Sequence, residues 1–464
     1  MLDVAVSPIL ALPVEILSEI FVHCLPTSHT NREWNTAHPS EAPMLLLHVC
    51  RIWREIAIDT SALWAKMEIS MDHAHSDEMA RAWLKRAKAC PLSVKLHRWP
   101  RWDGDEEDTY DDTSSDEDGN GDSSPDGEDG QDTCSIFQTL LELAHNLKFL
   151  ELSAIPSGYI RELDRLSGSC RFPLLQKLTI GINNGSYYWE YESMNDAPCV
   201  QLFRNAPLLR ELSLIGAAPP RFLKSLPWHQ LTKYTGTREK LYHCVDALRL
   251  SPNLVECAFA ACLTDESFLD TAIHSSLKSL TLFKGCFDTD IFIFLTLPAL
   301  ETLEILDCPE EWFNDEGFQE FLMCSSPPLR QFTIRFDRGT GPGADTFLSM
   351  PSLVQLEIWN AHKTFIAVFF DYFFDDTFLP QLQHLSFFHP HCPSEDVTRG
   401  QLHEIQTGLA ARWNARHHGF AQLKSFHFVW DREVDLSEDD LAPLREMLSE
   451  GLDITIKGAT HSYI

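Results

Sequence analysis

The side chains best suited to metal binding lie in His389-Pro390-His391-Cys392, where two imidazoles and a thiol fall within four positions. Structural zinc sites use such side chains, but need four ligands at tetrahedral positions. Ligands that flank a proline are poorly placed for this geometry, and no second cluster accompanies them. The sequence therefore predicts no metal site.

Other motifs that would indicate catalysis are absent from the sequence. The glycine-rich segment at 339–343 lacks the Lys-Ser/Thr pair of a phosphate-binding loop and is typical of a turn. Neither H-E-x-x-H nor G-x-S-x-G occurs. We therefore expect no catalytic residues, no cofactor and no enzyme activity, although scattered His, Cys and Asp side chains that meet in space would form an alternative site.

Arginine and aromatic residues recur at one position of a repeated phrase, L-x-x-L-x-L, directly after its third apolar residue. The row of these positions reads Gly181, Ile215, Ala260, Phe283, Leu306, Arg335, Trp359, Phe388 and Val429. Arginine and tryptophan are enriched at binding hot spots. We therefore interpret Phe283, Leu306, Arg335, Trp359 and Phe388 as candidate substrate-binding residues. Two alternatives remain open: neighbouring insertions cover the row, or the register is wrong by one residue.

The phrase itself supplies the elements that would position this row. It starts at Leu147, Leu175, Leu209, Leu231, Leu254, Leu277, Leu300, Leu329, Leu353, Leu382 and Leu423. The copy at Leu231 is degenerate, and most steps between copies are 22–29 residues long. Each copy predicts a short strand with inward side chains at alternate positions. The phrase and its period resemble leucine-rich repeats, which implies strands stacked in parallel into one curved sheet.

Between the strands, helices are expected at 264–273, 312–324 and 401–415, and irregular insertions near 183–198, 362–378 and 390–418. Cys262 and Cys308 stand where leucine-rich repeats often have Asn or Cys. After the last copy, a helix starting near Ser437 and a strand at 454–456 would cap the array. Upstream, a helix through about residue 89 and a strand at 92–96 form a connector.

The first seventy residues predict three short helices. Leu12-Pro13 opens the first, since proline is tolerated in a first helical turn. The second begins near Pro43, and the third is Ser61–Trp64. Helices this short cannot bury all their apolar side chains alone. By pattern alone, they would form a small subdomain packed on the rest of the chain.

The same residues resemble an F-box. The match consists of Leu12-Pro13-x-Glu15-Ile16-Leu17-x-x-Ile20-Phe21, Val49-Cys50-Arg51-x-Trp53-Arg54-x-Ile56-Ala57 and Leu63-Trp64. The long loop between its halves is similar to that in the F-box families of mushroom-forming fungi. The resemblance implies docking on a Skp-type adaptor and, through it, on cullin and RING subunits. The adaptor-facing positions that it implies are Leu12, Pro13, Ile16, Ile20, Leu46, Val49, Cys50 and Trp53. The alternative is that some of the apolar residues, chiefly Leu17, Phe21 and Ile56, form the F-box's own core.

Charge is concentrated in one segment. Residues 103–132 hold 15 of the 68 Asp and Glu residues and no Lys or Arg, within a chain of net charge −31. Such a segment lacks core residues and repels itself, so we expect a disordered insertion. The chain offers no basic surface for nucleic acid or for anionic membranes. Thirteen scattered cysteines without a C-x-x-C pair indicate reduced thiols and a cytoplasmic or nuclear location.

The expected fold is α plus α/β. It has an F-box-like helical domain (10–69), a connector helix and strand (70–102), a disordered acidic insertion (103–132), a leucine-rich-repeat solenoid with a parallel sheet (133–432) and a C-terminal cap (433–464). The expected function, implied by the resemblance, is that of a substrate-recognition subunit of an SCF-type cullin-RING ubiquitin ligase. The alternative is a non-catalytic repeat-based binding scaffold outside any ligase. The sequence does not reveal the protein substrate.

Overall fold

The computed structural model describes most of the chain as two compact units, Met1–Pro227 and Trp228–Ile464. The described residues are 9, 12–26, 38–71, 76–97, 129–168, 170–182, 199–216, 223–237, 241–260, 271–283, 291–308, 316–336, 344–390, 395–414 and 420–464. The expected insertion at 183–198, Cys262 and acidic residues 103–128 lie outside them. So do His391 and Cys392.

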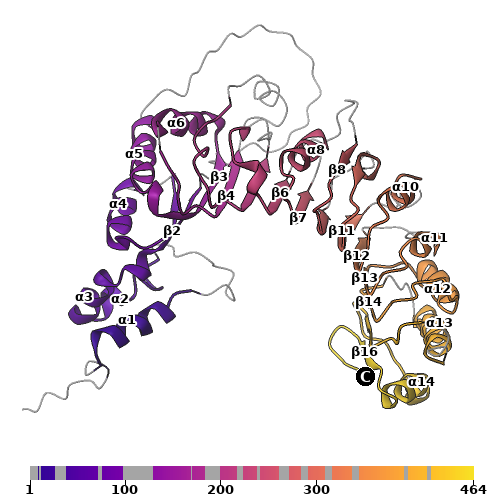
Figure 1. The fold of residues 1–464 in the computed structure, drawn as a ribbon. Coiled ribbons are helices and arrows are strands. Elements are labelled where there is room, and N and C mark those ends of the chain that lie inside the picture. The colour runs from indigo at the N-terminus through magenta and orange to yellow at the C-terminus, as the bar shows by residue number, and fades with distance from the viewer. Residues whose placement is uncertain are drawn as a thin grey trace, which may run out of the picture. The chain divides into compact units, whose positions relative to one another are not determined.

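The first unit combines short N-terminal helices with a parallel sheet (Figure 1). Its helical elements are α1 (Val14–His23), α2 (Leu46–Val49), α3 (Arg51–Asp59), η2 (Ser61–Trp64), α4 (Ser76–Ala87), α5 (Asp129–Glu142), η3 (Ala144–Asn146) and α6 (Ser157–Ser167). Its strands are β1 (Lys66–Ser70), β2 (Leu92–His97), β3 (Leu147–Ile155), β4 (Lys177–Ile182) and β5 (Glu211–Gly216). The strands neighbour one another in chain order, and every pair is parallel.

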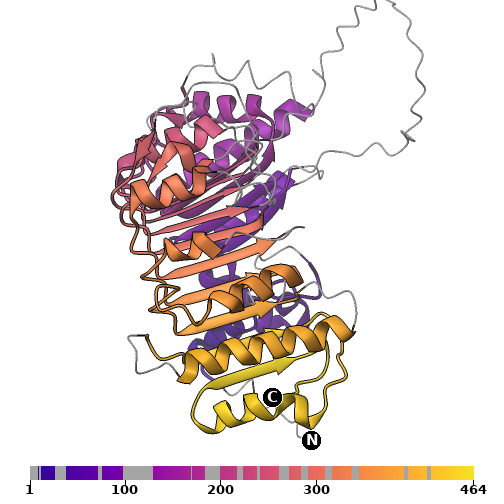
Figure 2. The same ribbon diagram turned by 90° about the vertical axis from the view of Figure 1, so that its right-hand side faces the viewer.

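The second unit is built in the same way. Its strands are β6 (Lys233–Thr237), β7 (Glu256–Ala260), β9 (Ser279–Phe283), β11 (Thr302–Cys308), β12 (Gln331–Phe336), β13 (Gln355–Trp359), β14 (His384–Phe388), β15 (Ser425–Val429) and β16 (Asp453–Lys457). Its helical elements are η5 (Trp228–Gln230), α8 (Leu241–Leu250), η6 (Ile291–Phe294), α10 (Glu316–Ser325), α11 (Ala344–Leu348), α12 (Lys363–Tyr372), α13 (Glu395–Asn414) and α14 (Glu438–Ser449). Two short strands, β8 (Ala272–Ile273) and β10 (Leu295–Thr296), form a separate parallel pair. Figure 2 shows the main strands of this unit stacked one above another.

The repeated phrase supplies every strand of the main sheet except β1, β2 and β16. Its apolar positions are at most 3% exposed in every copy. The register joins equivalent positions, since Leu356 is paired with Phe332 on one side and Leu385 on the other. Because side chains alternate along a strand, the second and third apolar residues of each copy enter the core together. The prediction of a mixed α/β fold with parallel strands is confirmed.

Helices cover the face of the second sheet that carries these buried side chains. On α12, Phe369 lies 5.6 Å from Phe387 between ring centroids, and Phe370 lies 6.3 Å from Phe426. Figure 1 shows α10 to α13 along one side of the strands. The row residues alternate with these buried ones, so they lie on the opposite face of the sheet.

Several predicted boundaries differ from the structure. The connector strand β2 lies between β1 and β3 in the same sheet, and the sequence analysis missed β1. Helix α5 begins at Asp129, inside the segment predicted to be disordered. The insertion expected near 362–378 contains α12. Helix α13 confirms the helix predicted at 401–415 but begins earlier, and the end of the helix predicted at 264–273 forms β8 instead.

Candidate protein-binding surfaces

The N-terminal helices are held together by a small core of their own. Pro13 precedes α1 with φ −56°, which suits a helix start. Leu17 and Phe21 lie one turn apart on α1, and both are buried. Phe21 packs against Trp53 of α3 with ring centroids 4.8 Å apart. Ile56 is also buried, so the expectation that these side chains form an internal core is confirmed.

Two tryptophans attach this helical segment to the rest of the first unit. The Trp64 Nε1–H donates to the Ala57 carbonyl (2.8 Å), and the Trp83 Nε1–H donates to the Trp64 carbonyl (3.1 Å). Their rings meet edge to face at 4.9 Å, and Arg86 lies 4.5 Å from the Trp64 ring centroid. Both indoles are buried, so η2 is fixed against α4 by packing and by hydrogen bonds.

Two stripes of exposed apolar side chains remain outside this core. Ile16 and Ile20 lie one turn apart on α1, and Leu12 lies four residues before Ile16, just ahead of the helix. A second stripe, Leu45, Val49 and Ile52, runs along α2 and into α3. These six side chains are each 36–52% exposed. We call the two sets the N-terminal stripes.

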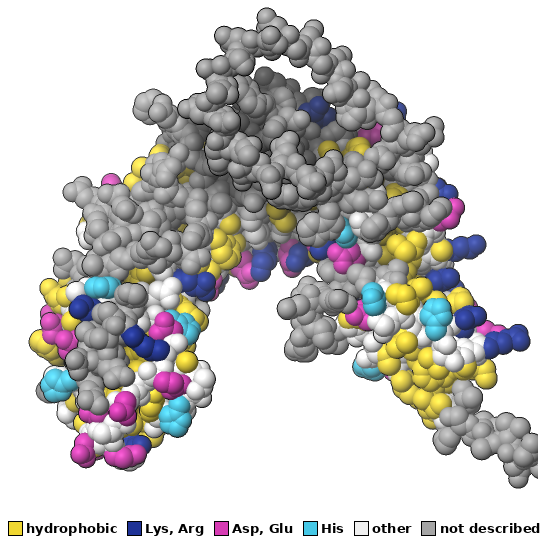
Figure 3. All heavy atoms as spheres, turned by 180° about the vertical axis from the view of Figure 1, so that it is seen from behind, with side chains coloured by type: hydrophobic (Ala, Val, Ile, Leu, Met, Phe, Trp, Pro, Cys, Tyr) yellow, Lys and Arg dark blue, Asp and Glu magenta, His cyan; other side chains and the backbone are white. Residues whose placement is uncertain are grey.

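The N-terminal stripes stand out among the described residues. Of the 18 exposed large hydrophobic side chains, eight lie between residues 9 and 52. They are Ile9, Leu12, Val14, Ile16, Ile20, Leu45, Val49 and Ile52. Figure 3 shows the hydrophobic side chains gathered over the N-terminal helices at the lower right. Single exposed apolar residues are ordinary, but such gathering is typical of an interaction surface.

Most residues predicted to face an adaptor are exposed. Leu12, Pro13, Ile16, Ile20, Val49 and Cys50 are exposed. Trp53 is half-buried against Phe21. Leu46, which was predicted to face the adaptor, is only 3% exposed and lies in the interior. Its neighbour Leu45 is exposed instead. Val14, Leu45 and Ile52 are exposed as well, although the sequence did not single them out.

The error at Leu46 has a local cause. Cys50 has an extended backbone (φ −159°, ψ 172°), and its Sγ accepts the Trp53 N–H at the start of α3. This extended residue separates α2 from α3 and resets the helical phase. The sequence predicts one continuous helix through Cys50, and this assigns Leu46 to the wrong face.

The second candidate surface is the row of the second unit, on the face of its strands opposite to the helices. Arg335, Trp359 and Phe388 occupy registered positions on β12, β13 and β14. The Arg335 guanidinium carbon lies 5.3 Å from the Trp359 ring centroid, and the Trp359 and Phe388 rings stack at 4.4 Å and 24°. The Trp359 Nε1–H donates to Glu357 Oε1 (2.6 Å) and thereby fixes the indole. All three row side chains are half-buried.

The row is less regular on the preceding strands. Phe283 is exposed at the end of β9 and is registered with Ala260. The register between β11 and β12 shifts between Ile305 and Cys308, so Leu306 is not paired in line with Arg335. His389, which directly follows the row, lies 5.5 Å from Trp359 between ring centroids. The structure therefore brings three of the five predicted residues into one stack and adds a histidine.

Groups with shifted pKa values lie elsewhere. Burial lowers the pKa of Arg412 to about 10, and burial raises the pKa of the Cys170 thiol. No group of three or more His, Cys, Asp and Glu side chains among the described residues has the arrangement of a metal site. Within the described part of the chain, no helix has both the length and the apolar character to cross a bilayer.

Comparisons with known proteins assign no family to these surfaces. No protein-family model matches the chain, and no curated protein matches it.

Proposed function

We propose that this protein is the substrate-recognition subunit of an SCF-type cullin-RING ubiquitin ligase. In this proposal, residues 10–69 are an F-box that docks on a Skp-type adaptor through the N-terminal stripes. The parallel strands with their helices form leucine-rich repeats that bind a protein substrate. The chain itself performs no chemistry, and its contribution is to hold the substrate near the ligase.

The observation that carries the proposal is the separation of inner and outer apolar residues in the N-terminal helices. Leu17, Phe21 and Ile56 complete the internal core, yet two further stripes remain exposed beside them. An internal core does not require these stripes, whereas a groove or helix of a partner would bury them. Four of the six stripe residues, Leu12, Ile16, Ile20 and Val49, also carry the F-box resemblance.

The test is binding of purified full-length protein to a purified Skp-type adaptor. Ile16→Glu/Ile20→Glu places two charges in the first stripe without touching the internal core. We expect the affinity to fall by at least about a hundredfold, as for central interface residues. The matched control is Ile273→Glu, which alters an exposed isoleucine of the second unit. It should leave binding unchanged.

Two results would lead to a different conclusion. If the folded native chain does not bind the adaptor, the ligase proposal fails, and the protein is a repeat-based binding protein with another role. If adaptor binding is normal but a cullin never joins the complex, the protein is a scaffold outside the ligase. Reconstitution with adaptor, cullin and RING subunits, followed by size-exclusion chromatography, separates these two cases.

A further inference from the structure

The row on the second unit extends beyond the residues that the sequence analysis selected. Phe388 is registered with Val429 on β15, and Val429 is registered with Lys457 on β16. Arg335, Trp359, Phe388, Val429 and Lys457 therefore occupy one line across five adjacent parallel strands. We call this line the β12–β16 row.

The charges of the β12–β16 row lie at its two ends. A cation stands at each end, and two aromatic rings and a valine lie between them. The row itself contains no carboxylate. Its central part is preorganised, because Trp359 is stacked on Phe388 and hydrogen-bonded to Glu357. Binding to rings that are already ordered requires little further loss of side-chain entropy.

The length of the row fixes the length of a matching ligand. Adjacent strands are about 4.8 Å apart, so four steps from Arg335 to Lys457 span about 19 Å. An extended chain covers about 3.3 Å per residue and crosses that span in about six residues. The opposite face of the sheet is covered by α12, so a peptide could reach these strands only from the face that carries the row.

We propose that the β12–β16 row binds an extended peptide segment with bulky apolar residues at its centre and an anionic side chain near each end. The central residues would pack on Trp359, Phe388 and Val429, and the anions would pair with Arg335 and Lys457. Charge complementarity within the row selects this occupant. The inference rests on the proposed function, which assigns this sheet face to the substrate.

The negative net charge of the protein helps to distinguish specific binding by the row from non-specific electrostatic attraction. With a net charge of −31, the chain attracts basic peptides non-specifically. Selection of an acidic peptide therefore reports the row and not the general field. The anionic group is a carboxylate or a phosphoryl group, and peptides carrying Glu or phosphoserine at the two ends distinguish these sources.

The experiment is selection of binders from a random ten-residue peptide library on the full-length protein. We expect enrichment of sequences with acids five to seven residues apart, the spacing that follows from the ~19 Å span, and with aromatic or aliphatic residues between them. The affinity of a selected peptide is then measured by fluorescence anisotropy. Arg335→Glu/Lys457→Glu should weaken binding by at least about tenfold. Substituting Lys for the acids of the peptide should restore binding to this variant.

The control is Lys363→Glu on α12, which makes at one position on the helical side of the sheet the charge reversal that the double variant makes at two. It should leave peptide affinity unchanged. Enrichment of basic peptides, no enrichment, or equal loss in the control would overturn the inference. Rescue by the Lys peptide shows that the double variant is folded. Adaptor binding is measured on the same samples, so failure of the row and failure of adaptor docking are seen separately.

Discussion

The rings of Phe21 on α1 and Trp53 on α3 pack with centroids 4.8 Å apart and planes inclined by 52°. This contact joins α1 to α3 within the N-terminal core. Trp53 is therefore a structural residue on its inner side, although the sequence placed it among the partner-facing positions.

Trp53→Ala should loosen the N-terminal helices. Loss of a half-buried indole that contacts Phe21 should lower the free energy of unfolding by about 2–3 kcal/mol. Hydrogen–deuterium exchange of α1 and α3 measures the effect. Ile52→Ala, at an exposed neighbour, is the control and should leave exchange unchanged. If exchange in α1 is unaltered by Trp53→Ala, the Phe21 contact does not hold the helices together.

Substituting alanine for each of two glycines of α13 should change the stability in opposite directions. A Cβ at Gly400 meets nothing within 4 Å, so Gly400→Ala should stabilise the helix by about 0.5–1 kcal/mol. A Cβ at Gly408 would lie 2.7 Å from Phe370 Cδ1 on α12. Gly408→Ala should therefore destabilise the second unit by about 1–3 kcal/mol. Urea unfolding of the two variants measures both signs, and equal effects would contradict this helix pairing.

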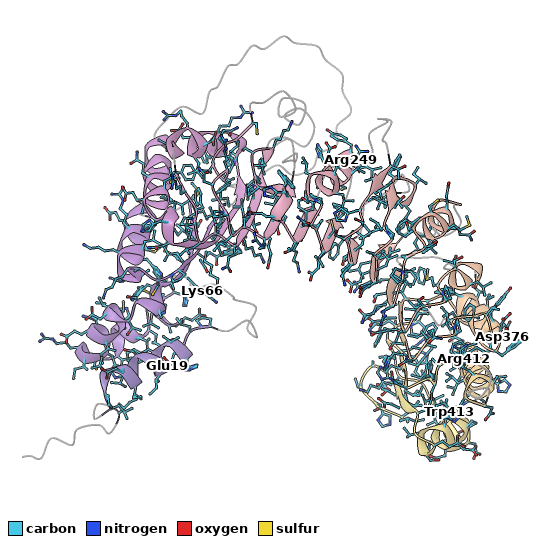
Figure 4. The ribbon with its side chains drawn as sticks, viewed as in Figure 1. Glu19, Lys66, Arg249, Asp376, Arg412 and Trp413 are labelled. Carbon is cyan, nitrogen blue, oxygen red and sulfur yellow. The ribbon has the colours of Figure 1, made fainter. Side chains whose placement is uncertain are left out.

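Even a substitution by lysine at Arg412, near the end of α13, should destabilise the protein (Figure 4). Its guanidinium donates to the carbonyls of Phe378 and Leu379, and its central carbon lies 3.8 Å from the Phe420 ring centroid. Lysine keeps the charge but cannot reproduce the planar fork. We expect Arg412→Lys to lower the unfolding free energy by about 2 kcal/mol, because a buried carbonyl loses its partner.

The control for Arg412 is Arg445→Lys, which alters an arginine that pairs with Glu438 at the surface of α14. An exposed pair contributes little, so stability should be nearly unchanged. Thermal unfolding followed by circular dichroism compares the two variants. Similar melting temperatures would show that the buried guanidinium contacts are unimportant.

Glu433 should make the C-terminal segment sensitive to acid. Hydrogen bonds from Thr460, through its hydroxyl and backbone N–H, and from Tyr463 and His461 hold the pKa of this carboxyl below its usual range. A lowered pKa means that the folded state favours the ionised form. Its stabilising contribution is present above the ordinary pKa of about 4.3 and is lost as pH falls through the lower folded value.

Limited proteolysis of the C-terminal segment across pH 3 to 6 tests this linkage. Cleavage after residue 457 should increase as pH falls in the native chain. In Glu433→Gln, cleavage should be faster at pH 6 and nearly independent of pH. Asp431→Asn changes a neighbouring acid and serves as the control. An unchanged pH profile in Glu433→Gln would rule out this carboxyl as the titrating group.

The strands could be predicted because their signal is local and repeated. Residues such as Leu356 and Ile358 alternate within one strand, and equivalent pairs recur in each copy with nearly complete burial. Strand β1 was missed because Met67 and Ile69 give only one alternation outside any copy of the phrase. Its place in the sheet depends on pairing with β2, a contact across more than twenty residues.

Helix α12 was missed for a different reason. Residues 365–370 are all apolar, although only Phe365, Ile366, Phe369 and Phe370 are buried and Val368 is exposed. An unbroken apolar run hides the helical period of the buried residues. For the candidate surfaces, the sequence indicated the stacked residues Trp359 and Phe388, but membership of Lys457 in the row depends on the register of β15 with β16.

The tryptophan contacts between η2 and α4 determine how firmly the N-terminal helices are attached to the rest of the first unit. Trp64 ends the last N-terminal helical turn, and β1 begins after a single intervening residue, Ala65. A partner bound to the N-terminal stripes would thus be attached to the first sheet through a buried joint instead of a flexible tether. Flexible linkers spread the attached molecules over many distances and lower their effective concentration. The buried contacts of Trp64 and Trp83 would therefore hold such a partner at a constant orientation relative to the first unit.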